Sequence, residues 1–377
     1  MKRKLTLSRG DLIVALAPIV AVLLAFAAGA VLLLILGADP IKAYAALIDG
    51  AFGNQASLFR TLTRATPLLI IAIGICIAFR GGVINIGAEG QVFIGAITAA
   101  AFSLWVGDTI TPLLFALLTL IVGFLAGAAW GAIPGFLKAR FDVNEILSTV
   151  MMNEIAVQLL IFLLSGPMLD PEQAAAGTRI PQSAQTPAGS WLARLAPPSQ
   201  LHIGLFIGLV MAIVVYVLLW RTTIGYKIRA VGLNKAASRY AGISVQRYMV
   251  LALTLSGGLA GLAGAVELTG ISHRMVEGFA VGYGFSGIVV ALFGRLHPIG
   301  AIPSAFLFGA LLVGADKMQR TVQVPAATVT TLQGLIVIFV VSSDYFIRRY
   351  NARRKAREVT AAPTTPNISQ PAPEAAV

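Results

Sequence analysis

The sequence predicts an all-α membrane protein that crosses the bilayer about ten times. Its 377 residues have a mean hydropathy of +0.85 and are 57% hydrophobic but only 12% charged, whereas roughly a quarter of the residues in soluble domains are charged. The apolar residues are gathered in runs that suit membrane spans. The formal charge of +12 does not indicate nucleic-acid binding, because the basic residues cluster beside these runs and so encode membrane topology.

The apolar runs define the spans. The first, Leu12 to Leu36, has 25 residues without a charge, and is predicted to be a retained span because a signal peptide has an apolar region of only about 7 to 15 residues. The second, third and eighth runs have about 15 residues each, which predicts spans that are broken or covered by other protein segments. The predicted spans are residues 12–36, 65–79, 91–106, 112–137, 146–165, 201–220, 248–270, 281–294, 299–315 and 329–347.

Ten crossings place both chain ends on one side of the membrane. Of the 28 Lys and Arg residues, 20 lie in segments on that side and eight in the opposite loops, so the positive-inside rule predicts that both termini are cytoplasmic. Residues 1–11 then form the cytoplasmic N-terminus and residues 12–347 the transmembrane domain. Residues 348–377 form a tail rich in Pro, Ala and Thr, which is expected to be cytoplasmic and disordered.

The segment from Arg80 to Gln91, RGGVINIGAEGQ, sets Asn85, Glu89 and Gln91 between two apolar runs. The charge distribution places it near the cytoplasmic ends of the second and third spans, where we expect a turn that shapes an inner gate. The three polar side chains are candidates for a substrate pathway. For Glu89 the alternative interpretation is an ion pair with Arg80 that locks the turn.

A second polar group lies in the fifth predicted span, where Asn153, Glu154 and Gln158 follow one another within two helical turns. An ionised side chain at mid-bilayer costs about 2.5 to 3.5 kcal/mol on insertion scales, so it needs a partner or a water-filled cavity. Groups that both donate and accept hydrogen bonds suit ribose hydroxyls and base edges. The stripe therefore predicts a substrate conduit, with contacts between helices as the alternative. Glu267 is expected to form an external ion pair near Arg274 or to contact a binding protein.

Two loops are unusually long. The external loop 166–200 is proline-rich and contains Trp191, which favours a surface lid or docking ledge. The cytoplasmic loop 221–247 carries six basic residues and no acidic residue. Within it, Asn234 is predicted to cap a short helix that Gly242 ends.

Several segments resemble one family. The sequence GYKIRAVGLNKAASRYAGIS, from Gly225, resembles the coupling loop of ATP-binding-cassette (ABC) importer permeases that handle branched-chain amino acids, ribose-type sugars and nucleosides. The segment from Gly82 to Gln91, together with Asn144 to Glu154 and GYGFSGIVVALFGRLHPIGAIPSAFLFGAL from Gly282, is most similar to the nucleoside and simple-sugar branch.

The resemblance implies a short helix that docks in a cleft of a cytoplasmic ATPase subunit. Ala236, Ala237 and Gly242 would allow close approach, and Arg239 and Tyr240 would supply polar and aromatic contacts. The chain has no GxxxxGK[ST] phosphate loop, so ATP and magnesium are expected on the partner ATPase and no cofactor on this chain. A second permease, an external solute-binding lipoprotein and the lipid membrane are the other implied partners, with no nucleic acid.

These observations lead to the expected function: a permease subunit, without its own ATP-hydrolysing site, that passes nucleosides across the bacterial cytoplasmic (inner) membrane by alternating access. A ribose-type sugar is the alternative substrate, with branched-chain amino acids third. An ion-coupled secondary transporter is the alternative class of protein. A membrane enzyme is disfavoured because no catalytic constellation is recognised. No metal site is expected, because His202, His273 and His297 are isolated from other ligands.

Overall fold

The secondary-structure elements among the described residues are all helices, and two isolated β-bridges lie outside them. The chain divides into two compact units, residues 31–330 and a unit of residues 1–30 with 331–377. The functional residues considered below lie in the unit 31–330. The computed structural model describes residues 9–342 except 176, 178, 179, 324, 326, 329, 332, 333, 336, 337, 340 and 341.

Seven helices in the described part are long and apolar enough to cross a membrane, which confirms a multi-pass, all-helical protein but not the predicted ten spans. The eighth predicted span contains only the 11-residue helix α12, Tyr283–Phe293. The first corresponds to α1, Arg9–Ile35, and the tenth, 329–347, lies mostly outside the described residues, as does the predicted tail. The seven are α3 Gln55–Arg80, α4 Ala88–Val106, α5 Pro112–Phe141, α6 Glu145–Ser165, α8 Gly204–Arg221, α11 Val245–Glu267 with its π-helical extension Leu268–Ser272, and α13 Pro298–Val322.

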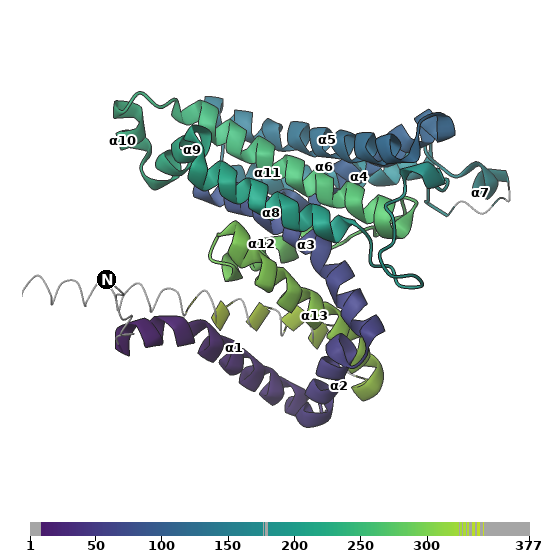
Figure 1. Ribbon diagram of the computed structural model, residues 1–377, viewed down its shortest axis with the longest axis vertical. Coiled ribbons are helices and arrows are strands. Elements are labelled where there is room, and N and C mark those ends of the chain that lie inside the picture. The colour runs from purple at the N-terminus through teal and green to yellow at the C-terminus, as the bar shows by residue number, and fades with distance from the viewer. Residues whose placement is uncertain are drawn as a thin grey trace, which may run out of the picture. The chain divides into compact units, whose positions relative to one another are not determined.

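Four shorter helices connect these spans. Helix α2, Pro40–Phe52, begins at Asp39, whose carboxylate accepts hydrogen bonds from the first backbone N–H groups. Helix α7, Pro171–Ala175, lies in the predicted external loop. Helices α9, Thr223–Leu233, and α10, Lys235–Tyr240, fill most of the predicted cytoplasmic loop. Helices α9 and α10 lie at one end of the α8–α11 pair and α7 lies at the other end (Figure 1).

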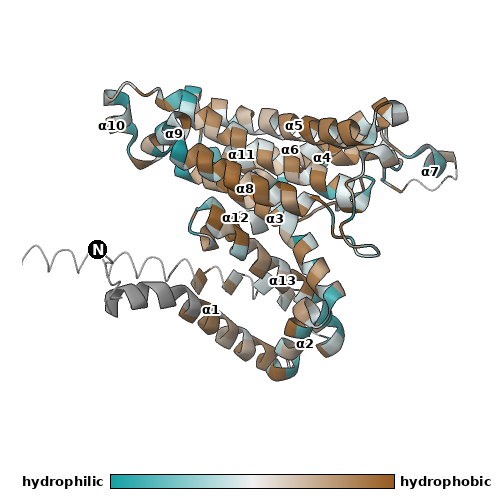
Figure 2. Cartoon of the chain, in the orientation of Figure 1, coloured by the Kyte–Doolittle hydropathy of each residue, from teal (hydrophilic) through white to brown (hydrophobic). Residues whose placement is uncertain are grey.

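Helices α3 and α11 form the centre of the bundle. In their most apolar windows, 83% of α3 and 78% of α11 is buried, against 22% of α6 and 28% of α8. Small residues allow this packing: a Cβ atom on Gly261 of α11 would lie only 2.8 Å from the Cα of Gly127 on α5. Glycines of α11 therefore allow its close packing against α5. Figure 2 shows mostly hydrophobic residues along α5 and α8 and more hydrophilic residues in α10.

Candidate translocation and coupling site

The turn between α3 and α4 is buried and its polar side chains bind one another. Asn85 donates to the Oε1 of Gln91 and to the Oγ of Ser256 on α11, both at 2.9 Å. Its Oδ1 accepts from the backbone N–H of Gly87 at 3.0 Å and from the Nε2 of Gln91 at 3.2 Å. Asn85 and Gln91 thus satisfy each other inside the protein, and in this conformation they fix the turn instead of facing an open path.

Helix α6 holds the same turn through Asn153. The Oδ1 of Asn153 accepts from the backbone N–H of Gly90 at 2.8 Å, and its Nδ2 donates to the carbonyl of Ile86 at 3.0 Å. Asn153 is only 5% exposed, whereas Glu154 and Gln158 are exposed on the other side of α6. The structure therefore separates the predicted stripe: Asn153 makes the contact between segments, and Glu154 and Gln158 form a polar face on the surface of the chain.

Glu89 and Arg80 bind opposite ends of α12, so the alternative interpretation of an ion pair between them is wrong. The carboxylate of Glu89 accepts from the backbone N–H of Gly282 and, at 2.7 Å, from that of Gly284, where a carboxylate complements the helix dipole. At the other end, the Nε of Arg80 donates to the carbonyl of Leu296 at 3.0 Å. Helix α12 is thus held between the polar turn and the end of α3.

Helix α10 has the predicted bounds and cap. The Oδ1 of Asn234 accepts from the backbone N–H of Ala237 at 3.0 Å, and the chain reverses at Gly242, whose φ of +75° favours glycine. Tyr240 is 95% exposed. Exposed positions include all six of the predicted coupling residues: Asn234, Ala236, Ala237, Arg239, Tyr240 and Gly242.

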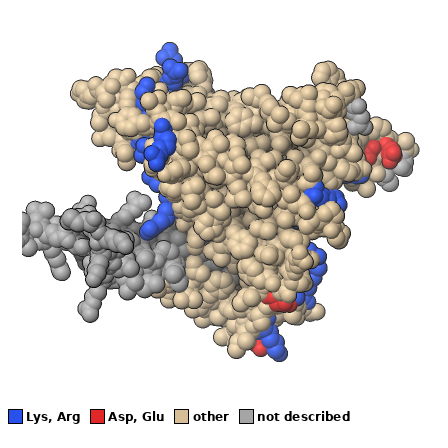
Figure 3. Space-filling model, in the orientation of Figure 1, with Lys and Arg blue, Asp and Glu red and all other residues tan. Residues whose placement is uncertain are grey.

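Helix α9 joins α10 to the polar turn, a contact that the sequence did not predict. A Cβ atom on Gly82 would lie 2.8 Å from the Cα of Gly232 at the end of α9. The guanidinium groups of Arg80 and Arg229 lie 5.5 and 5.4 Å from the ring centroid of Trp220 on α8. Two of the motifs that carry the family resemblance are thus in direct contact, at the end of α8 where Figure 3 shows basic side chains gathered.

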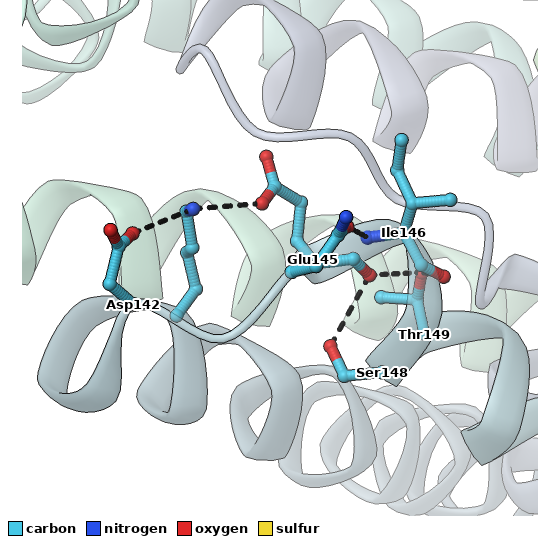
Figure 4. A network of polar contacts seen from close by, with 7 residues as sticks. Asp142, Glu145, Ile146, Ser148 and Thr149 are labelled. Atoms are coloured by element: carbon cyan, nitrogen blue, oxygen red, sulfur yellow. Dashed lines mark hydrogen bonds and ion pairs between the residues drawn. The ribbon is translucent and has the colours of Figure 1, made fainter.

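The turn between α5 and α6 lies on the same side of the molecule by the predicted topology. The Nζ of Lys138 lies 2.8 Å from the Oδ1 of Asp142 and 3.2 Å from the Oε2 of Glu145, and the backbone N–H of Ile146 is capped by Asn144 at 2.9 Å (Figure 4). The hydrogen bond from Lys138 and its charge hold the pKa of Asp142 below its usual range. This network fixes the start of α6.

A polar cavity lies at the other end of the bundle, between α2, α3 and α13. Its volume is about 500 Å³, and Arg64 lies in its wall. An Nη of Arg64 donates to the hydroxyl of Tyr283, and Tyr283 also hydrogen-bonds to Glu267. The expected external partner of Glu267, Arg274, is therefore wrong: Glu267 is buried and interacts with Arg64.

Sequence reasoning missed this cavity because it started the second span at residue 65. Helix α3 begins ten residues earlier, and Arg60 and Arg64 reduced the hydropathy of those first turns. Their spacing of four residues places them on one helix face, and this was the available signal.

The predicted external loop packs against the end of α11. The backbone N–H of Thr186 donates to the carbonyl of His273 at 2.8 Å, and the rings of Trp191 and His273 stack with centroids 4.0 Å apart. Burial lowers the pKa of His202 to about 4 and also lowers the pKa of His273. Among the described residues there is no group of three or more potential metal ligands.

A bundle with seven helices of membrane-spanning length defines a polytopic membrane protein. The family model described as "Branched-chain amino acid transport system / permease component" matches residues 57–341. The chain therefore belongs to this family and is a permease subunit of an ABC importer.

The relatives cover most of the chain. It is 38% identical over 336 residues to the guanosine ABC transporter permease protein NupP of Bacillus subtilis, which covers 88% of this chain and 94% of that protein. It is 33% identical to the nucleoside ABC transporter permease protein NupB of Lactococcus lactis, over 86% of this chain and 90% of that protein. It is also 33% identical to the glucose ABC transporter permease protein TsgB13 of Haloferax volcanii, over 88% of each.

Proposed function

We propose that this chain passes nucleosides across the bacterial cytoplasmic (inner) membrane by alternating access, driven by ATP hydrolysis on separate ATPase subunits. The observation that carries the mechanism is the exposed helix α10, which is connected through α9 to the buried turn at Gly82. The named substrates of two relatives, guanosine and nucleoside, support the choice of substrate. ATP and magnesium would bind the ATPase, and this chain would hold no cofactor.

The contacts supply a route from the ATPase to the membrane. A movement of α10 pulls on α9, and α9 packs against the Arg80–Gly82 end of α3. Arg80 binds the carbonyls of Arg295 and Leu296 just after α12, so α12 follows. Its other end carries Tyr283, which is hydrogen-bonded to Arg64 in the cavity wall. Alternating access then requires a rigid displacement of α12 and the α3–α4 turn.

The polar face of α6 supports a second permease as partner. Glu154 and Gln158 are exposed on a helix of membrane-spanning length, where lipid cannot satisfy a carboxylate. A second permease, with a conduit between the two chains, would keep these groups in a polar setting. The test is Glu154→Leu: we expect unchanged folding of the chain but at least a fivefold loss of transport, and normal transport would remove α6 from the pathway.

An external solute-binding lipoprotein would deliver the nucleoside to the end opposite α10. The decisive experiment reconstitutes the chain with its ATPase, second permease and binding protein in liposomes and measures uptake of labelled guanosine and labelled glucose. We expect ATP-dependent guanosine uptake. Uptake of glucose alone would establish the second candidate, a sugar permease, which the relative from Haloferax volcanii favours. Transport by the purified chain alone would instead indicate a secondary transporter.

A further inference from the structure

The polar cavity beside Arg64 has the size and lining of a small-molecule site. Its volume of about 500 Å³ falls within the usual range of about 300 to 1,000 Å³. Hydroxyl, amide, acidic and basic groups all reach it. The lining includes Asn54, Ser57, Thr63, Arg64, Gln200 and Asp316.

Arg64 is held in position from behind. It donates to the hydroxyl of Tyr283, which in turn is hydrogen-bonded to Glu267. A guanidinium group has five N–H donors in a planar fork, and among the described residues the one hydrogen bond of Arg64 goes to Tyr283. Four donors therefore stay available to a ligand in the cavity. The Oε2 of Glu267 is buried without a hydrogen-bond partner among those residues.

This geometry selects a particular type of nucleobase. A guanidinium binds the adjacent O6 and N7 acceptors of a 6-oxopurine in bidentate fashion, whereas adenine presents a donor at N6 beside the N7 acceptor. The carboxylate of Asp316 and the amide of Gln200 line the same cavity and suit ribose hydroxyl groups.

We propose that the cavity beside Arg64 is a transient site for a 6-oxopurine nucleoside, with Arg64 on the O6/N7 edge and Tyr283 and Glu267 as positioning residues. The proposal rests on the proposed nucleoside transport and names the substrate class. Because Tyr283 is the first residue of α12, the guanidinium group that would bind the ligand is also hydrogen-bonded to the moving helix.

Thiol protection tests the site without depending on transport. Ala56→Cys places a thiol in the cavity wall, where residue 56 is exposed, and the native Cys76 is buried. In the assembled transporter without binding protein, modification by a membrane-impermeant thiol reagent is followed with inosine, adenosine or glucose at millimolar concentration. We expect inosine to slow labelling at least threefold and adenosine or glucose to slow it less than 1.5-fold. The control is Ala175→Cys, exposed in α7 outside the cavity, whose labelling should not change.

Arg64→Lys separates recognition from folding, because it keeps a positive charge near Glu267 but loses the bidentate fork. In the Ala56→Cys background it should remove the difference between inosine and adenosine in slowing the labelling, while the transporter still assembles. Equal protection by all three compounds, or unchanged inosine protection after Arg64→Lys, would overturn the proposal. If Arg64→Lys does not assemble, Asp316→Asn decides: at least a twofold loss of inosine protection supports the site, and unchanged protection overturns it. Failure of the proposed function is distinct, since it appears as absent nucleoside uptake by the unmodified transporter.

Discussion

The buried α3–α4 turn and the exposed helix α10 both carry the family resemblance, yet they differ in how complete they are. In the turn, the side-chain groups of Asn85 and the Oδ1 and Nδ2 of Asn153 are all hydrogen-bonded within the chain. In α10 only Ser238 is buried, and the side chain of Tyr240 is 95% exposed. A short helix of this kind gains little stability by itself. The side-chain hydrogen bonds of the turn are therefore satisfied within the chain, whereas α10 presents an exposed surface that we expect a partner to cover.

The largest loss of stability is expected from breaking the hydrogen-bond network of the α3–α4 turn. Asn85→Leu removes hydrogen bonds to Gln91, Ser256 and Gly87 and leaves buried polar groups unsatisfied, at about 1 to 3 kcal/mol for each group. We expect a loss of several kcal/mol and little monodisperse protein, measured by thermal unfolding in detergent. Gln158→Leu, on the exposed face of α6, is the matched control and should leave the melting temperature unchanged. An Asn85→Leu protein as stable as the control would show that the hydrogen bonds of the α3–α4 turn are not needed for stability.

The opposite behaviour is expected at α10. Arg239→Glu changes an exposed side chain, so folding and melting temperature should stay the same, while stimulation of the ATPase by loaded binding protein should fall at least tenfold. Lys42→Glu, a charge reversal at another exposed position on α2, should leave stimulation intact. If both variants retain full stimulation, α10 is not the coupling surface.

Most of the membrane helices were readable from hydropathy, though not the first turns of α3, and α10 was readable from its cap residues, because both signals depend on local sequence. The partners of the polar side chains depend on the fold. Glu89 binds the start of α12 and Glu267 interacts with Arg64 on α3, contacts between segments about 200 residues apart. Helix geometry alone predicts that Asn153 and Glu154 point in different directions. That Asn153 is the one that faces inward is known only from its contact with α4.

A smaller loss of stability is expected at the contact between the α3–α4 turn and the start of α12. Glu89→Gln keeps one acceptor for the backbone N–H groups of Gly282 and Gly284 but loses the charge that complements the helix dipole, worth up to about 2 kcal/mol. We expect a small drop in melting temperature and at least a tenfold loss of uptake. Glu145→Gln, in the network with Lys138 on the surface turn, gives the comparison variant with normal uptake. If the loss of uptake by Glu89→Gln is fully explained by a loss of folded protein, Glu89 has a purely structural role.

The smallest effect on stability is expected in the predicted external loop, where the rings of Trp191 and His273 stack on each other. Burial lowers the pKa of His202 to about 4 and lowers that of His273, for which the charge of Arg194 is the second cause. A His with a lowered pKa stays neutral when folded, so its contribution is complete above its ordinary pKa of about 6.5 and is lost as the pH falls towards 4. The fluorescence of Trp191, obtained by subtracting the signal of Trp191→Phe from that of the wild type, should therefore change between pH 6.5 and 4. His202→Asn should shift or shrink this change, and a transition unaffected by that substitution would exclude His202 as its cause.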